Sequence, residues 1–359
     1  MNGSPDPMER LSQTLESLYR SCGYRQYKMS KFEEYDLYAQ NRNFLTDERI
    51  LTFTDLNGRL MALKPDVTLS VINNTRPGSE TRKVWYTENV YRSPRNGDSF
   101  QEIMQTGLEC IGAVDLYTMA EVLMLAGRSL AAAGRDYVLS LSHVGLAAGV
   151  LRAFAVPAER WSAVLAAVGG RNRHELRSLC PGEAGELLSA LCAVSGPAAE
   201  ALPGVLALPL PEESRAAAEE LQKLCSVLNA FGGVAAELDL SLVNDTDYYN
   251  GLLFRGYVDG AAAPVLSGGR YDHLLHRMGR EGSAVGFAVY LSELERLLRQ
   301  REEFDADTVL FYSPSDDPAA VAAEAQRRRA AGESVCVLPL GKTELRSRRR
   351  VDVKGNEVD

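Results

Sequence analysis

Strand-like segments joined by short turns are the feature that most constrains the fold of this 359-residue chain. Apolar and polar residues alternate on both sides of Asn57-Gly58, a dipeptide that favours a two-residue hairpin turn. A second pair of strand-like segments, 83–92 and 99–112, flanks a polar loop. Helical spacing is found in separate stretches, at 8–23 and 117–134. Because hairpins join antiparallel strands, the pattern predicts an α+β fold with an antiparallel sheet flanked by helices.

A change in composition divides the sequence into regions. Between 145 and 235 alanine, leucine and glutamate dominate and aromatic residues become rare, which predicts an inserted helical region. Strand-like segments are found again after residue 235. We therefore expect a core made of 8–144 and 236–304, and a final α/β unit over 305–359. That unit is expected to be partial, and to end in a basic tail with no secondary-structure pattern.

Composition and charge exclude several classes of protein. The net charge is −9 and the sequence pI is about 5.2, whereas proteins that hold a nucleic-acid backbone usually have a basic surface. No segment approaches the ~20 apolar residues of a membrane span, and no secretory signal precedes the first helix. The six cysteines are scattered, and His273 and His276 have no third ligand nearby. We expect a cytoplasmic protein without metal, cofactor, membrane or nucleic-acid partner.

Five segments, in order, resemble signatures of the class II aminoacyl-tRNA synthetases of the histidyl type. Together they extend from residue 8 to about residue 298, so the resemblance implies a synthetase-like core with a helical insertion. The segments are 24–38 for the first motif, 63–68 (LKPDVT), 90–112 for the second motif, 247–254 (DYYNGLLF) for histidine recognition, and 266–272 with 284–294 for the third motif.

The departures from this family concern the groups that hold ATP. Arg92 matches the second-motif arginine, but Pro94 replaces an acidic residue, Glu293 replaces the third-motif arginine, and Asn244 replaces a further arginine. Two unit charges ~4 Å apart interact by about 4 kcal/mol at an effective dielectric near 20, so a carboxylate at 293 opposes triphosphate binding. The resemblance then implies a retained fold with no catalytic residues. A local insertion would instead place Arg296 at that position.

The amino-acid pocket of the family is retained. Carboxylate and amide oxygens accept hydrogen bonds from an ammonium or imidazole group, and tyrosines add a ring wall and a hydroxyl. A structural role is equally open, because Asp66 and Thr68 can cap the helix after Pro65. A second alternative is a remnant pocket that is no longer suited to histidine. If extended, Tyr248 and Tyr249 point to opposite sheet faces. The candidate residues for a histidine-like ligand are Asp66, Thr68, Arg92, Gln105, Glu109, Tyr248 and Tyr249.

This combination resembles the regulatory subunits of ATP phosphoribosyltransferase. The resemblance implies a non-catalytic partner of the short-form catalytic subunit, needed for its activity and for feedback by histidine in the first step of histidine biosynthesis. It also implies a homodimer within a hetero-oligomer, with helix 8–22 and the strands after it at the interface. Two alternatives stay open: an active histidyl-tRNA synthetase-like enzyme, and an RNA-sensing module derived from a synthetase.

Overall fold

The computed structural model describes residues 6–41, 50–75, 81–93, 99–243, 249–298 and 304–358. The chain divides into two compact units, one of residues 11–295 and a second that contains 296–359 and the first ten residues. No helix in the described part of the chain is long and apolar enough to cross a membrane.

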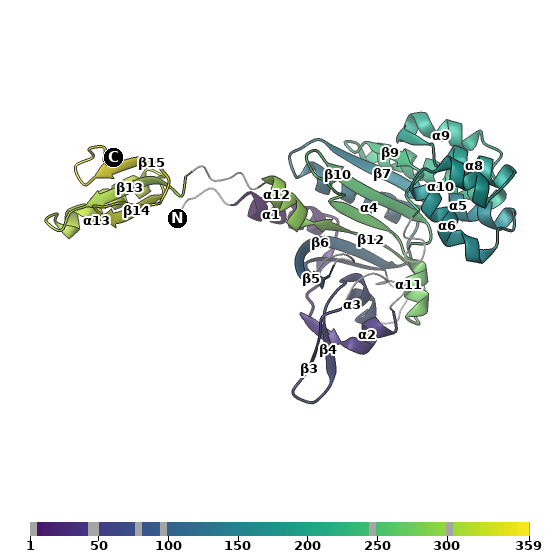
Figure 1. Cartoon of the computed structure of the whole chain (residues 1–359), viewed down its shortest axis with the longest axis horizontal. Coiled ribbons are helices and arrows are strands. Elements are labelled where there is room, and N and C mark those ends of the chain that lie inside the picture. The colour runs from purple at the N-terminus through teal and green to yellow at the C-terminus, as the bar shows by residue number, and fades with distance from the viewer. Residues whose placement is uncertain are drawn as a thin grey trace. The chain divides into compact units, whose positions relative to one another are not determined.

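A nine-stranded sheet organises the larger unit, with the strand order β1-β5-β6-β12-β11-β10-β7-β9-β8 (Figure 1). Its pairs are antiparallel except β1 with β5 and β7 with β9, so the predicted α+β fold with an antiparallel sheet is confirmed. The strands are β1 (Arg25–Gln26), β5 (Arg82–Arg92), β6 (Gln101–Gly112), β7 (Tyr137–His143), β8 (Ser195–Pro197), β9 (Ala236–Asp239), β10 (Leu252–Val258), β11 (Leu266–Arg270) and β12 (Ser283–Tyr290).

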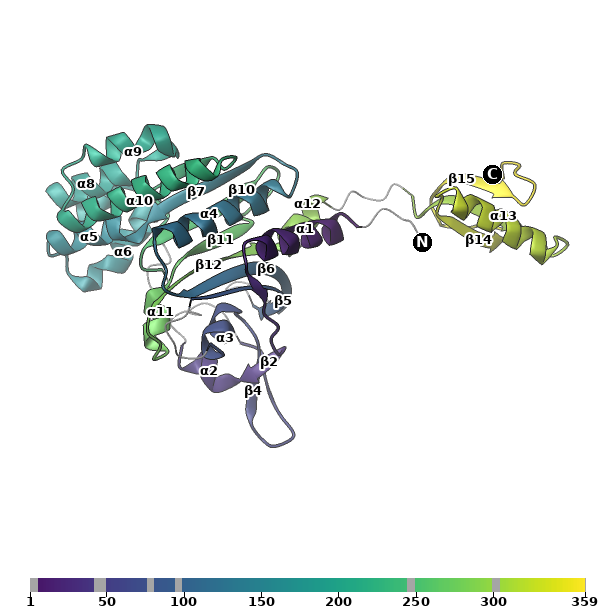
Figure 2. The same ribbon diagram turned by 180° about the vertical axis from the view of Figure 1, so that it is seen from behind.

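Helices α1 (Pro7–Ser21) and α4 (Leu116–Ala131) cover one face of this sheet, as Figure 2 shows. The ring of Tyr19 lies 6.5 Å from that of Trp85 and 6.1 Å from that of Phe287, and Phe287 in turn contacts Phe254 at 6.3 Å. The Tyr19 hydroxyl is 3.0 Å from the hydroxyl of Ser129 on α4. Large rings therefore fill this layer, and its buried polar tips pair with one another.

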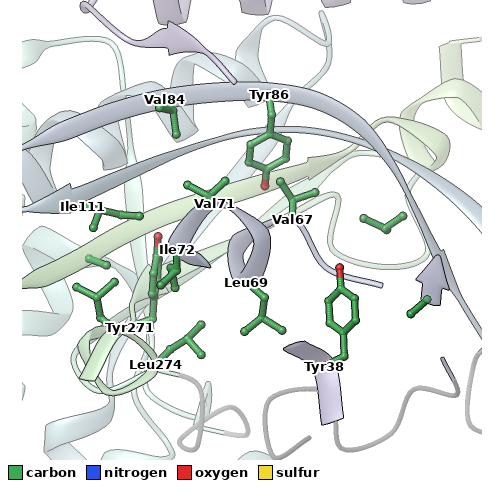
Figure 3. Packing of buried hydrophobic residues seen from close by; sticks show 14 residues of the cluster. Tyr38, Val67, Leu69, Val71, Ile72, Val84, Tyr86, Ile111, Tyr271 and Leu274 are labelled. Atoms are coloured by element: carbon green, nitrogen blue, oxygen red, sulfur yellow. The ribbon is translucent and has the colours of Figure 1, made fainter. Parts of the chain in front are cut away.

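The opposite face of the sheet is covered by short helices α2 (Tyr35–Ala39), α3 (Thr68–Asn73) and α11 (Asp272–Arg277). Val67 and Val71 of the α3 segment pack against Tyr86 of β5, and Tyr38 and Tyr271 belong to the same buried cluster (Figure 3). We call this layer the α3 face.

A small antiparallel sheet of order β2-β4-β3 adjoins the α3 face. It consists of β2 (Phe32–Glu34), β3 (Thr52–Thr54) and β4 (Leu60–Leu63), and its β3–β4 hairpin projects from the unit in both views. Gly58 has φ of +80°, which a glycine adopts without strain. The hairpin predicted at Asn57-Gly58 is confirmed.

Six helices follow one another between β7 and β9, and the short edge strand β8 lies among them. Figure 1 shows them gathered at the end of the large sheet where β7 and β9 lie. They are α5 (Val144–Ala153), α6 (Ala158–Gly169), α7 (Arg173–Leu179), α8 (Glu183–Leu191), α9 (Ala198–Leu206) and α10 (Glu212–Phe231).

The smaller unit contains a three-stranded parallel sheet of order β14-β13-β15 with one helix. Its elements are β13 (Ala306–Tyr312), α13 (Pro318–Ala330), β14 (Val335–Pro339) and β15 (Ser347–Asp352). The expectation of an unpatterned basic tail was wrong, because β15 contains Arg348, Arg349 and Arg350. Its Val351 packs against Leu310, which supplies the apolar contact that the arginine-rich sequence concealed.

Candidate functional site

Glu109 lies at the centre of a buried hydroxyl–carboxylate cluster on the α3 face. It belongs to β6 and is only 2% exposed. The hydroxyl of Thr68, at the start of α3, donates to Glu109 Oε1 at 2.7 Å. The hydroxyl of Tyr271, just before α11, donates to Oε2 at 2.5 Å. The sheet, α3 and the residue that joins β11 to α11 therefore meet at one carboxyl group.

A glycine in the neighbouring strand β12 gives this carboxyl group its space. Gly286 of β12 is paired with Glu109, and Gly269 of β11 is paired with Gly286. A Cβ atom at position 286 would lie 1.8 Å from Glu109 Oε2, far inside any permitted contact. The Glu109 side chain can thus extend over β12 towards Tyr271 only because residue 286 has no side chain.

Burial determines the protonation of the cluster. Burial, with a smaller contribution from the Asp66 charge, raises the pKa of Glu109 to about 8, although the two hydroxyl donors act in the opposite direction. Burial also raises the pKa of Asp66, while Arg92 and backbone N–H groups oppose that rise. A ligand N–H or cation that replaces lost water would favour the ionised form of Glu109. The site is therefore chemically suited to a basic or N–H-rich ligand.

Asp66 and Arg92 are held against each other at the edge of the cluster. Asp66 Oδ1 accepts the backbone N–H of Leu69 at 2.8 Å, so Asp66 makes the kind of helix-capping contact that was considered from the sequence. Arg92 Nη2 lies 3.5 Å from Asp66 Oδ2, and its Nε donates to the carbonyl oxygen of Pro65 at 2.7 Å. The arginine retained from the second motif thus holds the segment before α3.

Gln105 and Lys64 extend the polar surface beyond Glu109. Gln105 is 3% exposed and lies opposite Glu88 of β5 in the strand register. Lys64 is 1% exposed and forms an ion pair with Glu88, whose other oxygen accepts the backbone N–H of Met29 at 3.4 Å. This buried pair was not predicted from the sequence, whose one signal for it was the lysine in the segment 63–68 (LKPDVT).

The paired-tyrosine motif is described only in part. Tyr249 packs against the α3-face cluster, with its ring Cδ1 2.5 Å from where a Cβ of Gly269 would lie. Tyr248, Asn244 and Pro94 lie outside the described residues. Tyr271 was not among the predicted site residues although it contacts Glu109. The available signal was its position in the third-motif segment 266–272, directly after strand β11.

Helix α12 (Leu291–Leu298) contains the two residues that compete for the third-motif arginine position. It begins against β6, because Ser292 Oγ accepts the backbone N–H of Met104 at 2.9 Å. Leu294 is buried, Glu293 is partly buried and Arg296 is exposed. The burial of Leu294 and the exposure of Arg296 place Arg296 on the polar side of an amphipathic helix.

All six cysteines are free, and four of them are buried. Among the described residues, no group of three or more histidine, cysteine, aspartate or glutamate side chains is placed to hold a metal ion.

Comparisons with known proteins agree on one lineage. The family model described as histidyl-tRNA synthetase matches residues 5–294. A protein of Moorella thermoacetica named ATP phosphoribosyltransferase regulatory subunit is 32% identical, over 91% of this chain and 87% of its own length. A protein of the same name from Symbiobacterium thermophilum is 33% identical, over 94% of this chain and 88% of its own length.

Solved structures share the fold. A protein of Bacillus halodurans described as an ATP phosphoribosyltransferase regulatory subunit/histidyl-tRNA synthetase is 24% identical, with a TM-score of 0.77 over 96% of this chain and 93% of that one. Histidyl-tRNA synthetase from Nostoc is 16% identical, with a TM-score of 0.72 over 94% and 83%. A chain of the ATP phosphoribosyl transferase (HisG:HisZ) complex from Thermotoga maritima is 21% identical, with a TM-score of 0.63 over 79% and 97%. The expected class II synthetase-like fold is confirmed.

Proposed function

The chain belongs to the family of ATP phosphoribosyltransferase regulatory subunits, and from this premise we propose that it activates a short-form catalytic subunit and makes that subunit sensitive to histidine. The observation that most supports this is identity of 32% and 33% to two regulatory subunits over 91% and 94% of this chain. The reaction assisted would be the joining of ATP to phosphoribosyl pyrophosphate, the first step of histidine biosynthesis.

The subunit itself does not activate an amino acid. This part of the proposal is supported by Glu293, a carboxylate that stands at the third-motif arginine position. Arg92 is held by Pro65 and Asp66. Removal of one transition-state charge partner lowers a rate by about 10²–10³, so the loss of two or more leaves little activity.

Histidine is the effector, and the cluster around Glu109 is its sensor. Three features support this: a buried acid with a raised pKa, two hydroxyls that orient it, and the neighbouring carboxylate of Asp66. The imidazole N–H and ammonium of histidine would supply the donors that these oxygens accept. Tyr249 and Gln105 would complete the wall. Feedback then requires a coupling free energy of about 1–3 kcal/mol between this site and the catalytic subunit.

The chain acts as a homodimer within a hetero-oligomer in the cytoplasm. Exposed apolar residues after the first helix support a subunit interface there. Phe32 and Phe53 are 47% and 37% exposed, and their rings meet at 5.4 Å on the small β2-β4-β3 sheet. Six free cysteines fit a reducing compartment.

Reconstitution tests the regulatory proposal. The purified chain is mixed with a short-form catalytic subunit, and turnover is measured as histidine is added. We expect turnover to rise and histidine to inhibit it. If a cognate catalytic subunit shows neither effect, the proposal is wrong.

A matched pair of variants locates the sensor in the same assay. Thr68→Val removes a buried hydroxyl that donates to Glu109 at 2.7 Å, and Thr308→Val removes a buried hydroxyl that donates to Glu333 at 2.7 Å in the smaller unit. We expect Thr68→Val to raise the inhibitory histidine concentration about tenfold, and Thr308→Val to leave it unchanged. Equal inhibition of both variants would place the sensor outside the Glu109 cluster.

A further inference from the structure

A cavity lies between the helical insertion and the core, and of the described residues proposed to bind histidine, Tyr249 lines it. Its volume is about 470 Å³, within the range of small-molecule sites. Helices α5, α6 and α10 form one side, and α11 with the segment before β10 forms the other. Both views place α11 beside α5 and α6 (Figures 1 and 2). We call it the insertion cavity.

The floor of the insertion cavity is apolar, and small residues keep it open. Val144, Ala148 and Leu151 lie on one side of α5, because their spacing of four and three residues matches the helical repeat. These side chains are buried, as is Leu165 of α6. A ligand would therefore place an apolar or ring-like body on this floor.

A tryptophan with a fixed orientation forms part of the wall. Trp161 of α6 lines the cavity, and its indole N–H donates to the carbonyl oxygen of Val156 at 2.9 Å. The guanidinium of Arg152 lies 5.6 Å from the ring centre. Because its polar atom is already paired, Trp161 presents only its ring surface to a ligand.

The rim of the insertion cavity is basic. Exposed His273, His276 and Arg277 of α11 line one side, and Arg152 lies on the other. The one acidic residue of the lining, Glu213, forms an ion pair with Arg152. The lining thus contains two arginines and two histidines against one glutamate. Such a rim attracts an anionic group and repels an ammonium.

We infer that the insertion cavity binds a small organic phosphate with a planar ring, such as a nucleoside monophosphate. The ring lies on the apolar floor beside Trp161, and the phosphate meets Arg277 and the imidazoles of α11. A ligand in this position contacts both the helical insertion and the helix that directly follows Tyr271. It thus connects the insertion to the element that holds Glu109.

Intrinsic fluorescence reads this site directly, because the chain has only two tryptophans. Trp85 is 2% exposed, and its indole N–H has no hydrogen-bond partner in the described part of the chain, so Trp85→Phe loses no such bond. In that background Trp161 is the sole tryptophan, and its emission is excited selectively over that of the tyrosines. We expect AMP to change its emission saturably, while inorganic phosphate and L-histidine do so at least about tenfold more weakly. No saturable change with AMP, or equal affinity for histidine, would overturn the inference.

Two exposed arginines provide a matched test of the basic rim. Arg277→Ala removes a lining cation of α11, and Arg173→Ala removes an exposed cation of α7 that is not part of the cavity lining. We expect AMP affinity to fall about tenfold in the first variant and to stay unchanged in the second. Equal affinities in the two variants, with unchanged melting temperatures, would contradict the assignment. Activation of the catalytic subunit is a separate measurement, so failure here leaves the regulatory proposal standing.

Discussion

The two faces of the nine-stranded sheet bury different kinds of side chain, although the same strands form both. In β6, Leu108 points towards α1 and α4 whereas the next residue, Glu109, points to the α3 face, because side chains alternate along a strand. The first face buries rings such as Tyr19, Trp85 and Phe287. The second buries a carboxyl group whose pKa is raised to about 8. Burial of an acid opposes folding, so the α3 face is the place to look for a ligand.

The largest expected effect is a loss of stability on the apolar face. Phe254 is fully buried and its ring contacts that of Phe287, so Phe254→Ala should lower the free energy of unfolding by about 3–5 kcal/mol. Phe154→Ala, at a ring that is 40% exposed, should change it by less than about 0.5 kcal/mol. Denaturant unfolding of both variants measures this. Similar losses would mean that the α1–α4 face is not the main source of stability.

The substitution Gly286→Ala on the α3 face should impair the histidine response more than it lowers the free energy of unfolding. In Gly286→Ala the new Cβ would overlap Glu109 Oε2, which must move away from Tyr271. We expect unfolding free energy to fall by about 1–3 kcal/mol, together with loss of the histidine response. Gly204→Ala on α9 is the control, since its Cβ would meet no atom within 4 Å. A histidine response that survives Gly286→Ala would separate the sensor from Glu109.

The buried acid should make stability depend on pH. The folded state keeps Glu109 protonated up to about pH 8, whereas an ordinary glutamate loses its proton near 4.5. Between these values the folded state binds more protons than the unfolded chain, so the contribution of Glu109 to stability falls as pH rises. The melting temperature of Glu109→Gln should therefore decline less across this window than that of the wild type. Parallel curves would show that Glu109 is not buried as an acid.

The smallest effect on stability is expected at Asp66. Asp66→Asn retains a side-chain oxygen that can accept the N–H of Leu69, so the unfolding free energy should change by less than about 1 kcal/mol. The charge is lost, however, and the inhibitory histidine concentration should rise about tenfold. Steady-state inhibition measures this. A clear loss of stability with normal inhibition would assign Asp66 a structural role alone.

Local sequence signals predicted the parts of the molecule that local chemistry determines. Asn57-Gly58 located the hairpin, and the alternation around 83–112 located β5 and β6. The strand-like segment predicted over 99–112 contains Glu109, which is buried in β6.

Contacts between distant segments were not predictable in the same way. The hydroxyl of Tyr271 donates to Glu109, which lies 162 positions away in the sequence. Arg92 donates to the backbone carbonyl oxygen of Pro65, and because every residue has such an oxygen, no residue type in the sequence indicates this contact. The strand β15 was missed because a single buried residue, Val351, secures a segment rich in arginine. Tertiary packing determines all three, and no periodicity in the sequence records it.

Isotope exchange between pyrophosphate and ATP in the presence of histidine tests most directly whether this scaffold has lost amino-acid activation. The assay needs only the purified chain, with an active histidyl-tRNA synthetase as the positive control. We predict no exchange above background, because a carboxylate at Glu293 replaces the cation that would stabilise the triphosphate. Histidine-dependent exchange by the chain alone would contradict that claim and identify an active enzyme.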